Sequence, residues 1–410
     1  VAVVVSGAYA GHLATLAAGC PDLRHAIVLG DAAGAGRLAV HAADTFDPVR
    51  AAALDPGATT SDTPAFWLYS SGTTGRSKGV IHTHAHLQAT ADTYAASVLR
   101  TTPDDRTYSV AKLFFAFGLG NSLTFPFATG ATTILDPQRP TPAGVLDTIQ
   151  AEQPTLFFAS PGFMAALLDA RPDPAALASV RAAVTAGEAL PADLVRRYTA
   201  YFGHPVLDGI GSTEALHIFI SNTLDHQEPG TSGVAVPGYD LELRDDEGER
   251  ITAPDTPGYL HVRGPSTAVG YWQRPEATSE VFLDDWLKTG DVYVCTEGGY
   301  YQFLGRNSDM IKTGGIWVSP AEVEAALIEH PTVLEAAVVG GHDDDGLETT
   351  VAFVVPASGA TIDPDVLIAH CRARMAAFKR PRQVFVVDDL PKTATGKIQR
   401  FALRDGLSRQ

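Results

Sequence analysis

Residues 69–80, which read Tyr-Ser-Ser-Gly-Thr-Thr-Gly-Arg-Ser-Lys-Gly-Val, follow a short apolar run at 66–69 and decide the fold. They hold three glycines, five aliphatic hydroxyl side chains and one lysine, Lys78. Glycines let the backbone turn and present its N–H groups, hydroxyls donate hydrogen bonds, and the lysine adds positive charge. We therefore predict a loop that holds a polyphosphate. A flexible linker is the alternative, but linkers rarely follow a buried strand this closely. The glycine spacing also differs from that of a P-loop.

Length and charge limit the possible functions. A chain of 410 residues is long enough for two or three domains. The formal net charge of −17 argues against general binding to nucleic acid or to anionic membranes. No apolar run reaches the length of a membrane-spanning helix. Cys20, Cys295 and Cys371 lie too far apart for a metal motif or a disulfide framework, so we expect a cytoplasmic protein.

The first 230 residues alternate short apolar runs with helical stretches, which predicts a parallel α/β sheet covered on both faces. The expected strands are residues 1–5, 26–29, 66–69, 132–135, 155–159, 182–186 and 206–207. The chain begins inside such a strand and without a methionine, so we expect a fragment of a longer protein.

Residues 231–305 have the period-two pattern and tight turns of antiparallel hairpins. The expected strands are residues 241–244, 249–251, 259–263, 292–294 and 300–304. Glycines and polar residues then mark a boundary, so we predict domains at 1–308 and 309–410, the second a compact α+β unit. Its first helix should begin at Ser319, with Pro320 in the first turn and Glu322 closing a capping box.

Several polar residues follow glycine turns elsewhere in the chain. Thr213 and Glu214 could bind Mg²⁺, although the same segment also fits a strand-to-helix turn capped by Ser212 or Thr213. Asp291 could accept the hydroxyls of a ribose, and Lys397 could place a mobile cation on a phosphate. Taken alone, Asp291 is a weak signal because aspartate is common in turns, and Lys397 fits a solvated surface lysine better.

Three alternating histidines, His82, His84 and His86, follow the phosphate-like loop. A metal site is disfavoured, because no cysteine or glutamate stands at motif spacing and the segment runs into a helix. The sequence also has no Gly-x-Ser-x-Gly elbow and no evident cysteine nucleophile. Activation by ATP without a covalent enzyme intermediate fits better.

Taken together and in this order, the motifs resemble those of the acyl-adenylating superfamily, which includes acyl-CoA ligases, adenylation domains of peptide synthetases and luciferases. The resemblance covers essentially the whole chain, apart from roughly a hundred residues that precede it in the family. It implies a large α/β domain with a small antiparallel sheet, followed by a mobile C-terminal lid. The resemblance implies that Lys397 stabilises the transition state, that Thr213 and Glu214 serve phosphate and Mg²⁺, and that Asp309 is the hinge. The implied ATP and AMP contacts are Ser70, Ser71, Gly72, Thr73, Thr74, Gly75, Lys78, Gly187, Glu188, Asp208, Ile210, Gly211, Ser212, Asp291 and Arg306.

Residues 112–121 and 211–222 resemble benzoate-CoA ligase and its aryl relatives. This implies an acyl pocket at Ala116, Phe117, Gly211 and His217, where an aromatic ring suits a flat apolar acid; for His217 a core position is equally compatible. Gly314, Gly315 and Trp317 would border the path of coenzyme A. We expect an aryl-acid–CoA ligase that uses ATP, Mg²⁺ and coenzyme A, is a monomer or homodimer, and binds neither nucleic acid nor membrane. The alternatives are an adenylase that loads a carrier protein and a non-catalytic nucleotide-binding relative.

Overall fold

The computed structural model describes residues 1–30, 36–45, 57–70, 77–313, 316–342, 348–392 and 398–407. Residue contacts divide the chain into two units, Val1–Thr60 and Ser61–Gln410. Several predicted site residues lie outside the described residues: Ser71, Gly72, Thr73, Thr74, Gly75, Gly314, Gly315 and Lys397. Among the helices that are described, none is long and apolar enough to cross a membrane.

The first unit is a small parallel sheet with strand order β1-β2-β3. The strands are β1 (Ala2–Ser6), β2 (His25–Leu29) and β3 (Ala39–Ala42), which confirms the two strands predicted here and adds a third. A 3-10 turn, η1 (Gly7–His12), leads into helix α1 (Leu13–Gly19) between β1 and β2. Leu13 and Ala17 of this helix pack with Ala26 and Val28 of β2, which gives the unit a core of its own.

The second unit contains a seven-stranded sheet with strand order β12-β11-β10-β9-β8-β6-β7. Strands β6 to β10 pair in parallel, whereas β11 and β12 add antiparallel edge strands. Their bounds are β6 (Arg106–Ser109), β7 (Thr132–Ile134), β8 (Leu156–Ala159), β9 (Ala182–Ala186), β10 (Val206–Gly211), β11 (Ile218–Ser221) and β12 (Val234–Ala235). The predicted parallel α/β sheet is confirmed for residues 132–135, 155–159, 182–186 and 206–207, whereas the strands predicted at 1–5 and 26–29 pair in the separate small sheet.

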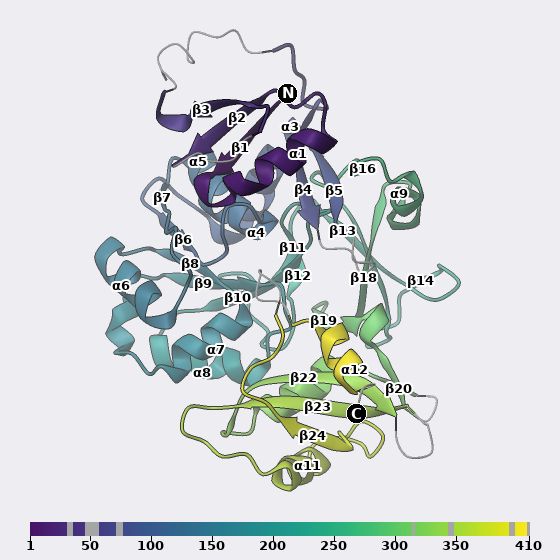
Figure 1. The fold of residues 1–410 in the computed structure, drawn as a ribbon. Helices are drawn as coiled ribbons and strands as arrows, with labels where there is room; N and C mark the ends of the chain where they lie inside the picture. The colour runs from purple at the N-terminus through teal and green to yellow at the C-terminus, as the bar shows by residue number, and fades with distance from the viewer. Residues whose placement is uncertain are drawn as a thin grey trace. The chain divides into compact units, whose positions relative to one another are not determined.

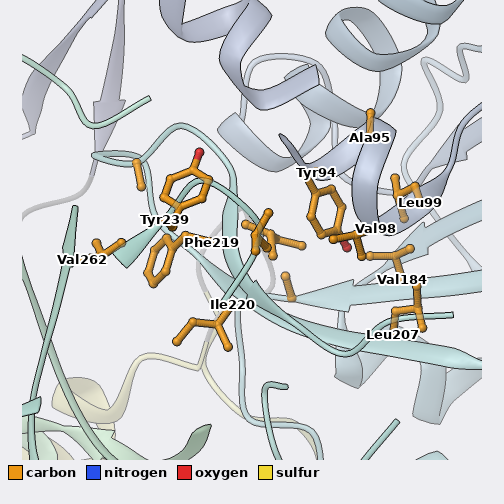
Figure 2. Close-up of a cluster of buried hydrophobic side chains, with 14 of the residues drawn as sticks. Tyr94, Ala95, Val98, Leu99, Val184, Leu207, Phe219, Ile220, Tyr239 and Val262 are labelled. Carbon is orange, nitrogen blue, oxygen red and sulfur yellow. The ribbon is translucent and has the colours of Figure 1, made fainter. Parts of the chain in front are cut away.

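Both faces of this sheet are covered, because alternate side chains of a strand point to opposite faces. Phe157 and Ala159 of β8 pack against the helices α6 (Pro142–Glu152), α7 (Pro161–Asp169) and α8 (Ala192–Phe202). Leu156 and Phe158 face the opposite side, toward the helical segment η3 (Ala91–Leu99). Figure 2 shows Tyr94, Val98 and Leu99 of η3 beside Val184 and Leu207 of β9 and β10. This burial on two sides explains the continuous apolar runs in the sequence.

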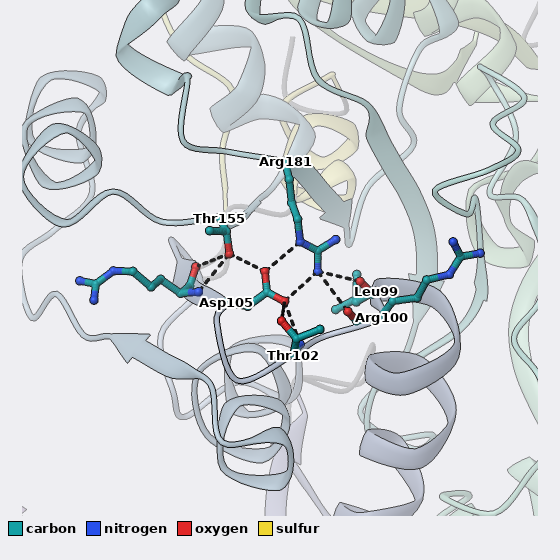
Figure 3. A network of polar contacts seen from close by, with 7 residues as sticks. Leu99, Arg100, Thr102, Asp105, Thr155 and Arg181 are labelled. Carbon is teal, nitrogen blue, oxygen red and sulfur yellow. Dashed lines mark hydrogen bonds and ion pairs between the residues drawn. The ribbon is translucent and has the colours of Figure 1, made fainter.

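One polar network ties the amino ends of three parallel strands together (Figure 3). Asp105 precedes β6, Thr155 precedes β8, and Arg181 precedes β9. The Asp105 carboxylate accepts hydrogen bonds from Arg181 Nε at 2.8 Å and from Thr155 Oγ1 at 2.6 Å. Burial opposes ionisation of Asp105, but these donors outweigh it and hold the pKa of the carboxyl below its usual value. The network therefore fixes the sheet at the edge opposite the carboxyl ends of its strands.

Antiparallel sheets make up much of the rest of this unit (Figure 1). One has the strand order β16-β5-β4, and the other runs β14-β13-β15-β18-β17 with β19 paired to β18. Their bounds are β4 (Pro64–Ser70), β5 (Lys78–Thr83), β13 (Asp240–Arg244), β14 (Arg250–Ile251), β15 (Gly258–Arg263), β16 (Gly270–Tyr271), β17 (Phe282–Leu283), β18 (Trp286–Cys295) and β19 (Tyr301–Arg306). The short helices nearby are α3 (His84–Thr90), α4 (Ala116–Leu119), α5 (Phe125–Thr129) and α9 (Pro275–Val281).

These sheets confirm the predicted hairpins and correct one assignment. The strand at residues 66–69 exists, but it pairs antiparallel with β5 and lies outside the parallel sheet. Its return strand reads Lys-Gly-Val-Ile-His-Thr from Lys78, and only two aliphatic residues stand together in it, so the apolar pattern did not reveal it. The predicted phosphate loop is therefore the connection of a β-hairpin.

The C-terminal part contains a hairpin, β20 (Ile311–Thr313) with β21 (Ile316–Val318), and the sheet β22-β23-β24. The sheet strands are β22 (Val333–His342), β23 (Glu348–Pro356) and β24 (Gln383–Val386), and the helices are α10 (Pro320–Ile328), α11 (Pro364–Arg372) and α12 (Arg400–Leu407). The Ser319 hydroxyl caps α10 by accepting from the Glu322 N–H at 3.1 Å, as predicted. The predicted capping box is wrong in its second half, because Lys379 donates to both oxygens of the Glu322 carboxylate at 2.7 Å.

Candidate active site

A cleft of about 1220 Å³ lies at the carboxyl ends of β9 and β10 and extends to the C-terminal part. Open parallel sheets bind ligands at this edge, because the loops that follow the strands converge there. Eight predicted site residues from distant parts of the chain line the cleft: Gly187, Glu188, Asp208, Ile210, Gly211, Asp291, Arg306 and Asp309.

Glycines shape the floor of the cleft. Gly187 ends β9 with φ of +100°, a conformation that favours glycine. On strand β10, a side-chain carbon on Gly209 would lie 2.8 Å from the Ile220 carbonyl oxygen. One on Gly211 would lie 2.4 Å from the His217 carbonyl oxygen. Close backbone approach therefore requires glycine at both positions, and it brings the 210–217 turn to the cleft.

Asp208 is a buried carboxylic acid on β10. Its Oδ1 atom has no hydrogen-bond partner among the described residues. Burial raises the pKa of this carboxyl well above its usual value, although a backbone hydrogen bond at Gly209 acts in the opposite direction. A buried oxygen without a partner is costly, so it is suited to accept a hydrogen bond from a ligand in the cleft.

Asp291 and Arg306 are register partners on the adjacent strands β18 and β19. The Arg306 Nε atom lies 2.9 Å from Asp291 Oδ1, and Arg306 also donates to the Thr289 carbonyl oxygen at 2.9 Å. Gly290, with φ of +77°, directs the chain into this position. The arrangement holds a buried carboxylate and a half-exposed guanidinium side by side at the cleft.

Glu214, Tyr271 and Lys78 come together beside the predicted phosphate loop. Tyr271 donates its hydroxyl to Glu214 Oε1 at 2.8 Å, and Lys78 Nζ lies 4.7 Å from the centre of the Tyr271 ring. Tyr271 reaches this place because β16 pairs with β5, the strand that begins at Lys78. Burial, followed by the nearby Glu214 carboxylate, raises the pKa of Tyr271, so its hydroxyl stays protonated and can donate.

The histidine segment supports the same turn. His82 donates from Nε2 to the Thr213 carbonyl oxygen at 2.8 Å, and its Nδ1 atom lies 3.0 Å from Nδ1 of His86. Burial lowers the pKa of His82 to about 4, which keeps the ring neutral near neutral pH. His82 therefore fixes the backbone at Thr213. The turn leads into strand β11, so the alternative of a strand-to-helix turn capped by Ser212 or Thr213 is wrong; Ser212 instead accepts from the Ala215 N–H at 3.1 Å.

The predicted acyl-pocket residues form an aromatic group behind the 210–217 turn. Phe117 of α4 and His217 have ring centres 5.6 Å apart, and His217 also contacts Tyr94 and Phe125. Asn121 lies 3.1 Å from His217 Nε2, and burial lowers the pKa of His217 to about 3. Among the described residues Gly211 lines the cleft, whereas Ala116, Phe117 and His217 lie outside its lining.

The C-terminal part closes one side of the cleft through residues next to Lys397. Glu188 Oε1 accepts a hydrogen bond from the Ile398 N–H at 3.3 Å. Asp309 lies in the 3-10 turn η6 (Asn307–Asp309), and Arg404 of α12 lies 3.1 Å from its carboxylate. Trp317 is exposed on the hairpin β20–β21, with Lys312 Nζ 5.4 Å from the centre of its ring. No described group of three or more histidine, cysteine or acidic side chains forms a metal cluster.

Family models match two parts of the chain. The AMP-binding enzyme model matches residues 6–272, and the C-terminal domain model of AMP-binding enzymes matches residues 322–397. The chain belongs to the AMP-binding enzyme family. This confirms the superfamily predicted from the motifs.

Relatives and solved structures extend the comparison. This AMP-binding enzyme is 48% identical over 390 residues to a benzoate–CoA ligase of Thauera aromatica, with 94% of this chain and 72% of the relative covered. It matches the structure of the anthranilate CoA ligase AuaEII in complex with anthranoyl-AMP, with TM-score 0.91, 38% identity and 99% and 78% of the two chains covered. It also matches a benzoate CoA ligase from Burkholderia xenovorans LB400, with TM-score 0.87, 42% identity and 98% and 79% coverage.

Sequence reasoning missed Tyr271 and the supporting role of His82. Tyr271 stands in an ordinary aromatic segment, and only the pairing of β16 with β5 brings it to Glu214. The sequence signal for His82 was its position directly after the predicted phosphate loop. Its hydrogen-bond partner, Thr213, lies 131 residues further along the chain.

Proposed function

We propose that this AMP-binding enzyme is an aryl-acid–CoA ligase. The carboxylate of a benzoate-like acid attacks the α-phosphorus of ATP, pyrophosphate leaves, and an acyl-AMP forms. The thiolate of coenzyme A then attacks the acyl carbon, which gives the aryl-CoA thioester and AMP. The observation that carries the proposal is the convergence of eight predicted nucleotide and hinge residues on one cleft in a chain of this family. The aromatic acid rests on the likeness to benzoate and anthranilate ligases.

The nucleoside would occupy the cleft between β10 and β18. The free Oδ1 atom of Asp208 would accept a hydrogen bond from the exocyclic amino group of adenine. Asp291 would bind the ribose hydroxyls, with Arg306 beside it to hold the carboxylate in place. Ile210 would contact the adenine through dispersion alone. An aromatic side chain at this position would instead stack on the base.

The phosphates would lie between the β4–β5 connection and the 210–217 turn. Lys78 would offer a positive charge and Thr213 a hydroxyl, so both favour the negative charge that builds up on the transferring group. Glu214 fits a role as a magnesium ligand, because its Oε1 atom is occupied by Tyr271 while a second carboxylate oxygen remains for a hard cation. When bound, Mg²⁺ would neutralise phosphate charge. One protein carboxylate, with substrate phosphates and water completing the shell, is typical for this ion.

The acid would lie beside the 210–217 turn. Phe117 would present an apolar ring to a flat acid, and the neutral His217 ring would line the pocket without adding charge. Ala116 and Gly211 would leave room for the carboxylate to approach the α-phosphorus.

We further propose that residues 309–410 form the mobile lid. In adenylation the lid would place Lys397 against the phosphates, and it would then turn about Asp309. Gly314, Gly315 and Trp317 would next border the path of the pantetheine arm. Asp309 suits a hinge because it lies in η6, at the start of the proposed lid. We expect a cytoplasmic monomer or homodimer that acts on small molecules.

A substrate panel tests the proposal. The purified chain should form benzoyl-CoA from benzoate, MgATP and coenzyme A without any carrier protein, and it should prefer aryl acids to short aliphatic acids. Thioester formation is read by mass spectrometry and the first step by pyrophosphate exchange. Exchange without thioester, restored by a carrier protein, would favour the carrier-loading adenylase. ATP binding without exchange would identify a non-catalytic relative.

A further inference from the structure

The residues on either side of 393–397 are anchored within the C-terminal part. Lys392 and Ile398 form an antiparallel bridge across residues 393–397. Lys392 Nζ lies 2.7 Å from Glu335 Oε2 on β22, and Arg400 donates to both oxygens of Glu324 on α10, at 2.8 and 2.9 Å. All four of these side chains belong to the C-terminal part, so they would move together with the lysine segment.

A further contact to this segment comes from the other side of the hinge. The Ile398 N–H, one residue after Lys397, donates to Glu188 Oε1 at 3.3 Å. Glu188 follows β9 and is held near the cleft by Gly187, whose φ of +100° sets the direction of the chain. A carboxylate of the large domain thus binds the backbone beside Lys397.

From this contact we propose that Glu188 is the catch that holds the C-terminal part in place at Ile398 during adenylation and releases it for thioester formation. The proposal rests on the proposed function, since it assigns Glu188 to one of the two half-reactions. Glu188 acts here as a positioning residue through the backbone of Ile398. This role differs from the adenine contact that the family resemblance implied.

The charges around Glu188 come almost entirely from the lid. Glu335 faces it from β22, Lys392 from the segment after β24, and Arg400 from α12. Arg400 is itself paired with Glu324 and is influenced by Asp309 at the hinge. A side-chain carbon on Gly162 of α7 would lie 3.7 Å from Glu188 Oε2 and 3.6 Å from Glu335 Oε1, so both carboxylates flank this glycine.

These surroundings of Glu188 couple closure of the lid to protonation of its carboxylate. Burial, followed by Glu335, raises the pKa of Glu188 to about 7, whereas Arg400, Ile398 and Lys392 act in the opposite direction. An exposed glutamate in an open lid would have a pKa of about 4.3. Because the pKa is higher in the closed state, closure takes up a proton, and its advantage is lost as the pH rises through 7. A neutral Glu188 can still accept from the Ile398 N–H through its carbonyl oxygen.

Two substitutions distinguish the effect of the Glu188 hydrogen-bond acceptor from the effect of its negative charge. Glu188→Ala removes the acceptor and should lower kcat of benzoate-dependent pyrophosphate exchange on the order of tenfold, with the KM for ATP unchanged. Thioester formation from supplied benzoyl-AMP and coenzyme A should be retained. Glu188→Gln resembles the neutral acid, so exchange should stay near the wild-type level below pH 7. It should also persist toward about pH 9, where the wild-type rate declines.

The control is Glu152→Ala, which removes a half-exposed carboxylate paired with Arg106 and should change neither half-reaction. Equal losses in both half-reactions, or a higher KM for ATP with kcat unchanged, would overturn the catch. So would identical pH profiles for wild type and Glu188→Gln, even if Glu188→Ala fails to fold. A wild-type chain that forms no benzoyl-AMP would instead contradict the proposed function.

Discussion

At the scale of single residues, Tyr271 shows how a site depends on contacts that a motif does not contain. Its hydroxyl holds one oxygen of Glu214, and its ring lies beside Lys78. It therefore connects the predicted magnesium ligand to the predicted phosphate loop. Neither of those motifs includes residue 271. Tyr271 lies in the two-residue edge strand β16, in which Gly270 is its only companion.

Tyr271→Phe should weaken the response of the enzyme to magnesium. Removing a hydrogen bond to a carboxylate costs about 1.5–3 kcal/mol, so the Mg²⁺ concentration for half-maximal pyrophosphate exchange should rise roughly tenfold or more. The control is Tyr259→Phe, whose hydroxyl donates to the exposed Asp246 at 2.6 Å. A magnesium titration that is unchanged in Tyr271→Phe would contradict the role of Tyr271 in orienting Glu214.

Lys397→Ala tests the residue that the motifs assign to the adenylation transition state. Loss of one preorganised cationic donor should lower adenylation by about 10²–10³-fold. Thioester formation from supplied acyl-AMP should be largely intact, because the lysine would have left the site by then. Pyrophosphate exchange and thioester release are measured separately. Equal losses in the two would refute this assignment.

At the scale of structural elements, the parallel sheet has one edge built for stability and the opposite edge built for binding. Asp105, Thr155 and Arg181 tie the amino ends of β6, β8 and β9 (Figure 3). The carboxyl ends of β9 and β10 lead into Gly187, Glu188 and the 210–217 turn at the cleft. Strong fixation at one edge leaves the other free to carry glycines and a buried acid without a partner.

Asp105→Ala should therefore destabilise the fold without changing the residues of the candidate active site. Removing the buried carboxylate leaves Arg181 and Thr155 without their shared partner, so the free energy of unfolding should fall by about 3 kcal/mol. Urea unfolding measures this change. The control Asp240→Ala breaks an exposed pair with Arg263 and should cost less than about 0.5 kcal/mol. Similar losses in the two variants would show that the network contributes no more than a surface pair.

The same network predicts a pH dependence. The pKa of Asp105 is lowered in the folded protein, so its contribution to stability is complete above the unfolded value of about 3.9. It is lost as the pH falls through the folded pKa. The difference in stability between wild type and Asp105→Ala should therefore shrink in acid, and a difference that grows would contradict this sign.

At the scale of the whole molecule, we propose that residues 309–410 change position between the two half-reactions. Asp309 is paired with Arg404 of α12, so the predicted hinge is already attached to the part that would move. Glu188 and Ile398 add a contact on the far side of the cleft. In the proposed mechanism these two contacts would act as the hinge and the catch of a single lid.

Asp309→Pro should impair the second half-reaction. Proline fixes φ near about −65° and so restricts the rotation that the hinge would need. We expect pyrophosphate exchange to survive while thioester formation falls. Asp309→Ala, which removes the pair with Arg404 but leaves φ free, is the matched control. If exchange collapses together with thioester formation in the proline variant, the hinge at Asp309 is wrong.

The sequence alone determined the family, the enzyme class and most of the elements, because those depend on local patterns. Apolar runs identified β8, β9 and β10, glycine-rich turns pointed to Glu214 and Asp291, and the family resemblance pointed to Asp208. It also placed Ser319 at the start of α10. These signals are local, since strand burial, turn geometry and helix caps act over a few neighbouring residues.

Only the tertiary structure decided which groups meet. Three contacts join residues that lie 57 to 210 positions apart: the Tyr271 hydroxyl with Glu214, the His82 imidazole with Thr213, and the Ile398 backbone with Glu188. The antiparallel pairing of β5 with β4, within one hairpin, also became evident only in the structure. Such contacts are set by strand pairing and packing, which local pattern does not encode. Burial at these contacts also sets the charge state of His82, Asp208 and Glu188, because the pKa of a side chain depends on its surroundings rather than on its sequence neighbours.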